Sequence, residues 1–190
     1  MLLLVGLGNP GSNFTNTRHN IGFKIIDAIN AHFKLSKQKP KFKGLLTTGS
    51  IDEKKIYAIK PLTFMNNSGT AIKELIDYFK IDAKDVIVFH DDMDIDFGKI
   101  KAKVGGSSAG HNGIESIDKF IGKDYSRVRI GIGHPKQKKK VNNHVLEDFK
   151  EDEEEKIKEI TENIVKQIPT LIDRKIDLFS SKVNQNLNGI

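Results

Sequence analysis

A short apolar run near the start of the chain, Leu2-Leu3-Leu4-Val5-Gly6, constrains the fold most strongly. An apolar run of this length that ends in a glycine turn is typical of a β-strand buried on both faces. It lacks the charged segment that opens a signal peptide. No apolar run in the chain approaches the roughly 20 residues that a membrane-spanning helix needs. We therefore expect a soluble, cytoplasmic protein built around a buried strand.

Helical and strand patterns alternate along the rest of the chain. Apolar spacing predicts helices over Asn20–Phe33, over Ser68–Phe79 with Ser68 as the N-cap, and over Gly113–Ile121. The acidic stretch Glu147–Glu162 leads into a further helix, and Pro169 is expected to interrupt the C-terminal helical pattern. Strands are predicted over five segments: Phe42–Ser50, Lys55–Lys60, Val86–Phe89, Ile100–Val104 and Arg127–Ile132. The first two of these form a hairpin through the turn from Ile51 to Lys54.

This interleaving predicts an α/β fold with a mixed, twisted central sheet and helices on both faces. A length of 190 residues suits one domain. We therefore expect a single domain over residues 1–190, to which the C-terminal helical segment from about residue 147 belongs. Nothing in the sequence suggests more than a monomer.

The charges are distributed unevenly. Residues 1–140 carry 24 Lys and Arg against 14 Asp and Glu, a difference of +10, whereas residues 141–190 carry 7 against 11, a difference of −4. The basic part includes a loop over Lys136–Asn143. An anionic partner such as a nucleic acid is one interpretation of this asymmetry, and a lysine-rich solubilising surface is the other.

One short motif suggests a dinucleotide site. Gly6-Leu7-Gly8-Asn9-Pro10-Gly11 matches G-x-G-x-x-G directly after a strand. The helix opens several residues too late, however, and the next strands form a hairpin rather than the second arm of a βαβ unit. A nucleotide-dependent oxidoreductase is therefore a weak alternative.

Other chemistries lack their usual residues. Asp92, Asp94 and Asp96 resemble a calcium loop, but Phe97 and Lys103 stand where that loop needs glycine and glutamate. The six histidines show no spacing typical of zinc ligands. The chain has no cysteine and no G-x-S-x-G elbow, so the common covalent nucleophiles have no marker. We expect neither a metal nor a cofactor, and a hydrolase on this chain would activate water directly.

The remaining polar residues gather where strands end or helices begin. His19 follows a polar loop, Asp91 lies at the mouth of the strand from Val86, and Asn9, Asn66 and Asn112 lie in three further loops. A histidine base needs a carboxylate that fixes its tautomer, and asparagine amides can donate to an oxyanion. Taken singly, each residue has a structural alternative: His19 as a cap of the helix after Asn20, and each Asn as a turn residue.

Six motifs stand out along the chain: Val5-Gly6-Leu7-Gly8-Asn9-Pro10-Gly11, Thr17-Arg18-His19-Asn20-Ile21-Gly22, Lys60-Pro61-Leu62-Thr63-Phe64-Met65-Asn66-Asn67-Ser68-Gly69, His90-Asp91-Asp92-Met93-Asp94, Gly110-His111-Asn112-Gly113 and Arg129-Ile130-Gly131-Ile132-Gly133-His134-Pro135. In their order and spacing, and over residues 1 to about 165, these six motifs resemble the bacterial-type peptidyl-tRNA hydrolases.

The resemblance implies hydrolysis of the ester between a peptide and the 3′ end of tRNA. By position, His19 resembles the general base, Asp91 its carboxylate partner, and Asn9 the residue that distinguishes blocked from free aminoacyl-tRNA. The resemblance further implies substrate contacts for the remaining residues of the expected site, which are Phe14, Phe64, Met65, Asn66, His111 and Asn112, and tRNA phosphate contacts for Lys103 and Arg129.

Three positions depart from the family pattern. Phe14 stands where Tyr is common, the loop from Gly105 to Gly110 has fewer glycines, and Glu115 replaces a basic residue. None of them changes the pair His19 and Asp91. A non-catalytic RNA-binding member of the same fold is the alternative function, against which the retained His19, Asp91 and asparagines argue.

Overall fold

The computed structural model describes residues 1–135 and 141–187. Within them, seven strands form one mixed sheet in the order β2-β3-β4-β1-β5-β7-β6. The strands are β1 (Leu2–Gly6), β2 (Lys39–Lys41), β3 (Gly44–Ile51), β4 (Lys54–Pro61), β5 (Val86–Asp92), β6 (Ile100–Val104) and β7 (Ser126–Gly131). Strands β4, β1, β5 and β7 run parallel, whereas β2, β3 and β6 are antiparallel to their neighbours.

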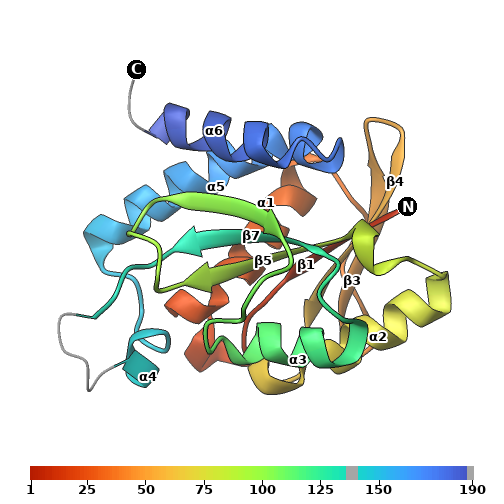
Figure 1. Cartoon of the computed structure of the whole chain (residues 1–190), viewed down its shortest axis with the longest axis horizontal. Helices are drawn as coiled ribbons and strands as arrows, with labels where there is room; N and C mark the ends of the chain where they lie inside the picture. The colour runs from red at the N-terminus through yellow and green to blue at the C-terminus, as the bar shows by residue number, and fades with distance from the viewer. Residues whose placement is uncertain (136–140, 188–190) are drawn as a thin grey trace.

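Helices cover both faces of the sheet, as the sequence predicted (Figure 1). The α-helices are α1 (Ile21–His32), α2 (Ser68–Phe79), α3 (Asn112–Ile121), α4 (Val141–His144), α5 (Glu151–Ile172) and α6 (Ile176–Leu187). Short 3₁₀ turns are η1 (Ser12–Phe14), η2 (Arg18–Asn20), η3 (Met65–Asn67) and η4 (Ala83–Asp85). Helices α1, α5 and α6 pack their apolar side chains against one face of the sheet. Helices α2 and α3 pack theirs against the other face. No described helix is long and apolar enough to cross a membrane.

The glycines at the start of the chain let helix α1 approach the sheet. A Cβ on Gly6 would lie 2.2 Å from the carbonyl oxygen of Gly22, and one on Gly22 would lie 2.3 Å from the backbone nitrogen of Leu7. Helix α1 begins only at Ile21, after two 3₁₀ turns. The glycine pattern therefore serves backbone packing between β1 and α1, and its geometry is not that of a dinucleotide-binding turn.

Three details differ from the expectation. Strand β5 continues to Asp92, so Asp91 lies within a buried strand rather than at its mouth, because β5 stays paired with β7 as far as Gly131. Asn67, not Ser68, occupies the N-cap position of α2, because η3 runs directly into the helix. The Lys136–Asn143 loop falls largely outside the described residues, and residues 141–143 belong to α4.

Pro169 does not interrupt the C-terminal helix, contrary to the prediction. Helix α5 passes through it to Ile172. The proline removes one backbone hydrogen bond and costs about 3 kcal/mol in a helix interior. Ile168, Leu171 and Ile172 are buried in the core around it, each contributing about 1.5–3 kcal/mol. Burial therefore outweighs the cost of the proline.

The edge strand β6 is closed by side chains of α6. Ser180 Oγ accepts a hydrogen bond from the backbone N–H of Ala102 at 2.9 Å. The side chain of Asn184 both accepts from the N–H and donates to the carbonyl of Ile100, at 3.0 and 2.8 Å. Helix α6 thus supplies the pairing partners that a neighbouring strand would otherwise offer.

Candidate active site

His19 and Asp91 meet at the carboxyl end of strand β5. His19 lies in η2, just before α1, and Asp91 lies in β5. His19 Nδ1 is 2.8 and 2.9 Å from the two carboxylate oxygens of Asp91, and both residues are buried. The ring of His19 therefore contacts a carboxylate and does not cap the helix, which removes the structural alternative for this residue.

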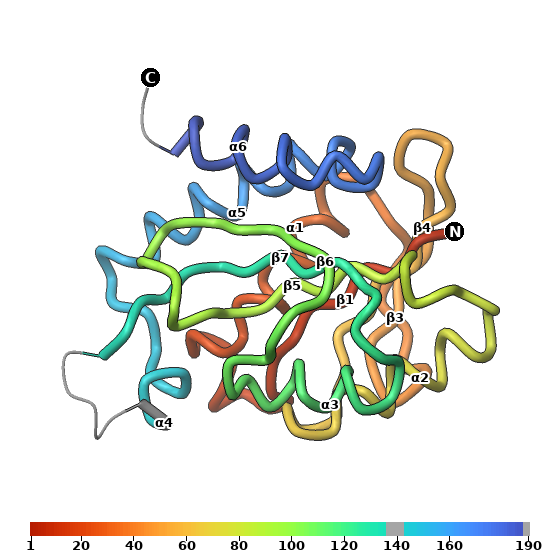
Figure 2. The backbone as a smooth tube through the Cα atoms, in the orientation of Figure 1, coloured from red at the N-terminus to blue at the C-terminus, as the bar shows by residue number. Residues whose placement is uncertain are grey.

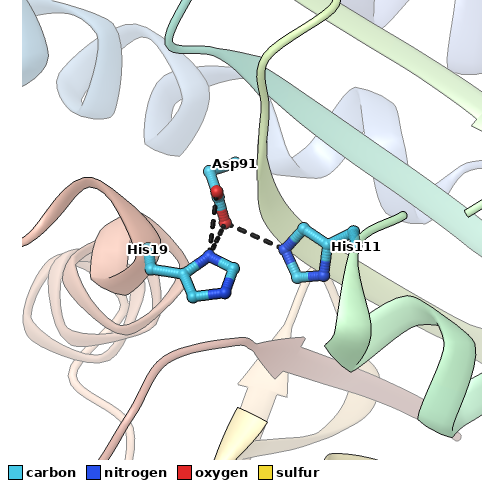
Figure 3. Close-up of side chains that lie close together, drawn as sticks. All are labelled: His19, Asp91 and His111. Carbon is cyan, nitrogen blue, oxygen red and sulfur yellow. Dashed lines mark hydrogen bonds and ion pairs between the residues drawn. The ribbon is translucent and has the colours of Figure 1, made fainter. Parts of the chain in front are cut away.

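A second histidine shares the same carboxylate (Figure 3). His111 Nε2 lies 2.9 Å from Asp91 Oδ1. His111 is the N-cap of α3, and its Nδ1 accepts from the N–H groups of Gly113 and Ile114. Its ring hydrogen must therefore be on Nε2, where it is donated to Asp91. This arrangement assigns His111 a role beside Asp91 that the sequence did not indicate.

The hydrogen-bond pattern fixes the tautomer of His19. An ionised carboxylate only accepts hydrogen bonds, so Nδ1 of His19 carries the hydrogen and Nε2 keeps a free lone pair. Burial lowers the pKa of His19, but the charge of Asp91 and the hydrogen bond to it outweigh burial and raise that pKa. Burial likewise opposes ionisation of Asp91, and the two histidines more than compensate, so its pKa lies well below the usual range. Asp91 is thus the permanent acceptor of the pair.

Asn9 is held by a neighbour from the histidine segment. The side chain of Asn20 accepts from the backbone N–H of Asn9 and donates to its carbonyl, both at 2.9 Å. The side-chain oxygen of Asn9 accepts from the N–H of Met65 at 2.9 Å, which sets the orientation of the amide. Its NH₂ group has no bond to any described residue and is free to donate to a ligand.

A cavity of about 490 Å³ contains most of the expected site. Its wall includes every predicted residue except three; the predicted residues that line it are Asn9, His19, Phe64, Met65, Asn66, Asp91, His111 and Asn112. Phe64 is 61% exposed at its rim. The side-chain amides of Asn66 and Asn112 make no hydrogen bond to the described part of the chain, so both can turn toward a substrate.

Phe14, Lys103 and Arg129 are not part of the cavity wall. Phe14 lies half-buried in η1. Lys103 and Arg129 lie on the face of β6 and β7 that α5 and α6 leave uncovered, next to Arg127. Lys103 stands opposite Arg127 in the pairing of β6 with β7, and burial together with the charges of Arg127 and Arg129 lowers the pKa of Lys103. Arg129 Nε also donates to Asp92, a cavity residue, at 2.8 Å.

Sequence reasoning gave no role to His90 or to residues 145–149. His90 is fully buried, donates from Nδ1 to the carbonyl of Asp91 at 2.7 Å, and packs edge-on against His111 with ring centres 4.9 Å apart. Burial, then His111 and Arg127, keep the pKa of His90 well below its ordinary value, so its ring is a neutral support. The position of His90 beside Asp91 in one motif was the only available signal.

The same side chains have the composition of a metal site. His19, Asp91 and His111 offer three ligand atoms that lie within 4.8 Å of one another. Each nitrogen is already hydrogen-bonded to the carboxylate, however, and that pairing accounts for the cluster. Two of the three acidic residues of the apparent calcium loop have other partners: Asp92 forms an ion pair with Arg129, and Asp94 contacts His134.

Comparisons with known proteins show the family of the chain. Residues 3–189 match the family described as peptidyl-tRNA hydrolase. The chain is 72% identical over 184 residues to the peptidyl-tRNA hydrolase of Pelagibacter ubique, covering 97% of this chain and 99% of that protein. It is 45% identical over 189 residues to that of Bartonella henselae, covering 100% and 98% of the two chains. The crystal structure of the Acinetobacter baumannii enzyme superimposes with a TM-score of 0.90 at 32% identity, over 97% and 94% of the two chains. The chain therefore belongs to the peptidyl-tRNA hydrolase family.

Proposed function

We propose that this protein hydrolyses the ester between peptide and tRNA in peptidyl-tRNA, with His19 as the general base. The observation that carries this role is the pairing of His19 Nδ1 with the ionised Asp91, which leaves Nε2 free. Nε2 takes a proton from water, and the water attacks the ester carbonyl. No covalent intermediate is needed. A positioned base of this kind contributes roughly 10²–10⁴-fold to the rate.

Side-chain amide groups around the cavity can donate hydrogen bonds to the negative charge that develops on the ester carbonyl oxygen. Asn66 lies in η3 and Asn112 at the start of α3, two elements in contact, and the side-chain amides of both make no hydrogen bond to the described part of the chain. An oriented donor contributes on the order of 10²–10³-fold. Phe64, exposed at the rim, offers a ring on which a base or an apolar side chain of the substrate can stack.

Asn9 would select substrates whose amino group is blocked. Its oxygen is occupied by the N–H of Met65, so the group that faces the cavity can only donate. A peptide carbonyl next to the ester accepts such a hydrogen bond, whereas a free ammonium group has no lone pair for it. The enzyme would therefore release tRNA for reuse in translation in the cytoplasm without destroying aminoacyl-tRNA.

The decisive experiment compares N-acetylated with free aminoacyl-tRNA as substrates of the unaltered protein and of His19→Ala. We expect rapid release from the acetylated substrate only, and a loss of at least about 10²-fold in kcat for His19→Ala with tRNA binding nearly unchanged. Normal turnover by His19→Ala would disprove the role of His19. If the unaltered protein binds N-acetylated aminoacyl-tRNA but does not hydrolyse its ester, the non-catalytic RNA-binding alternative is correct.

A further inference from the structure

The segment that carries His19 is paired with a second segment 126 or more residues later in the chain. Residues 145–149, which we name the clamp segment, run antiparallel to residues 16–19. Backbone N–H groups of Arg18 and His19 donate to the carbonyls of Glu147 and Val145, at 3.0 and 2.8 Å, and the N–H of Phe149 donates to Asn16. Figure 2 shows these segments, red and blue-green in the colour scheme, at the same end of the molecule. His19 therefore has its backbone fixed by the clamp segment and its ring fixed by Asp91.

The side chain of Arg18 ties this pairing to helix α5. Arg18 is 3% exposed, and its two terminal nitrogens lie 2.9 and 2.8 Å from Glu153 Oε2. Its guanidinium carbon lies 5.0 Å from the ring centre of Phe149, in the clamp segment. The same oxygen of Glu153 accepts from the backbone N–H of Lys150, where α5 begins. This partly buried ion pair thus joins residues 16–19, the clamp segment and the first turn of α5.

We propose that the Arg18–Glu153 ion pair positions His19 for catalysis, a role that rests on the proposed function of His19 as the base. Arg18 acts through the backbone of its neighbour and touches no substrate. Loss of the pair leaves the bond between His19 and Asp91 possible but allows the His19 backbone to shift within the site. A shift of about 1 Å at a reacting group can cost on the order of 10²-fold in rate.

The chain contains a matched control for this pair. Lys24 Nζ lies 2.8 Å from Glu154 Oε1 and 5.5 Å from the ring centre of Phe149, so it joins α1 to the same turn of α5. The side chains of Lys24 and Glu154 are 25% and 40% exposed, and neither contacts residues 16–19 in any described interaction. A purely structural contribution of α5 would be disturbed by loss of either ion pair, whereas positioning of His19 depends on Arg18–Glu153 alone.

The test measures kcat, KM and the thermal midpoint for Arg18→Met, Glu153→Gln, the double variant, Arg18→Lys and Lys24→Met. We expect kcat to fall about ten- to hundredfold in either single variant, with KM within about twofold and no additional loss in the double variant. Arg18→Lys should restore part of the rate. Lys24→Met should keep kcat within about twofold.

A second readout does not depend on turnover. The Nδ1 hydrogen of His19, bonded to Asp91, should give a sharp downfield proton resonance in the unaltered protein and in Lys24→Met. It should broaden or move in Glu153→Gln, which keeps the shape of the side chain and serves if Arg18→Met does not fold. An unchanged resonance and unchanged kcat in folded Glu153→Gln would overturn the proposal. Failure of the general-base role would instead show in His19→Ala, which would then retain turnover.

Discussion

One carboxylate, Asp91, determines the chemistry available to two histidines. It accepts the Nδ1 hydrogen of His19 and the Nε2 hydrogen of His111, and His90 supports its backbone carbonyl. In the proposed mechanism, the ionised Asp91 stabilises the imidazolium that would form when His19 takes a proton. The same attraction raises the pKa of His19. His19 is therefore neutral, and able to act as a base, only at a higher pH than an ordinary histidine.

This electrostatic coupling predicts the pH dependence. His19 acts as a base only when neutral, so kcat/KM should rise with pH and level off above a pKa higher than 6.5. In Asp91→Asn the burial that lowers the pKa remains and the attraction that raises it is lost, so the midpoint should move to lower pH. The plateau should fall by about 10²–10⁴-fold as the tautomer is released.

Asp94 provides a matched control for this measurement. Its carboxylate also lines the cavity but contacts His134 at the surface. Asp94→Asn should leave the midpoint of the pH profile where it is in the unaltered protein. A profile of Asp91→Asn with the same midpoint as the unaltered protein would contradict the proposed coupling between Asp91 and His19.

The sequence predicted the residues of the candidate site but not the contacts between them. His19, Asp91 and Asn9 stood out because their motifs occur in the family's order. The bonds of His111 to Asp91 and of Asn20 to Asn9 join residues of different loops, and only the folded backbone brings them together. The N-cap contact of His111 was not predicted either, because histidine is not among the usual N-cap residues.

At the level of elements, β6 and β7 form a ribbon with two unlike faces. Ile100, Val128 and Ile130 pack under α5 and α6, whereas Lys103 and Arg129 point to the opposite side. The uncovered face lies beside the loop from Gly105 to Gly110, where Arg127 donates to the carbonyl of Ser107. Cations grouped next to the cavity suit the phosphates of an RNA strand whose 3′ end enters the site.

Binding to tRNA should report these cations through its salt dependence. Lys103→Ala and Arg129→Ala should each weaken binding and reduce the slope of log K against log salt by about 1, because each lost phosphate contact releases one fewer counterion. Lys55→Ala, which removes a charge from β4 where Lys55 lies over Tyr57, should leave the slope unchanged. If the slope of log K against log salt were the same in all three variants, the RNA would not contact Lys103 or Arg129. Filter binding over a range of salt concentrations suffices.

Strand β2 and the turn that follows it were not predicted, because their residues lack the patterns typical of a strand and a tight turn. Strand β2 is Lys39-Pro40-Lys41, which has no apolar alternation, and its turn to β3 consists of Phe42 and Lys43. Both turn residues have φ of 53°, a conformation that usually calls for Asn or Gly. The apolar strands and amphipathic helices were predicted within a few residues, because burial of their faces dictates their spacing. Strand β2 depends instead on pairing with β3.

At the level of the whole molecule, the cavity collects side chains from nearly the entire chain. Its wall runs from Asn9 to Leu146, and the clamp segment closes one side of it. The sequence indicated an acidic C-terminal helix with no assigned role. The fold gives its first turn a partner in Arg18, a contact that no local pattern could have predicted because the two residues are 135 positions apart.

The closed edge of the sheet has a consequence for the protein in concentrated solution. Strand β6 would be a template for a second molecule if Ser180 and Asn184 did not occupy its backbone groups, while the other edge is blunted by Lys39, Pro40 and Lys41. The variant Ser180→Ala with Asn184→Ala should scatter more light on gentle warming than the unaltered protein, and Ser181→Ala, on the exposed side of α6, should not. Equal scattering would mean that α6 shields the edge by bulk alone. Two small polar side chains of α6 thus occupy the backbone groups through which a second molecule could otherwise pair with β6.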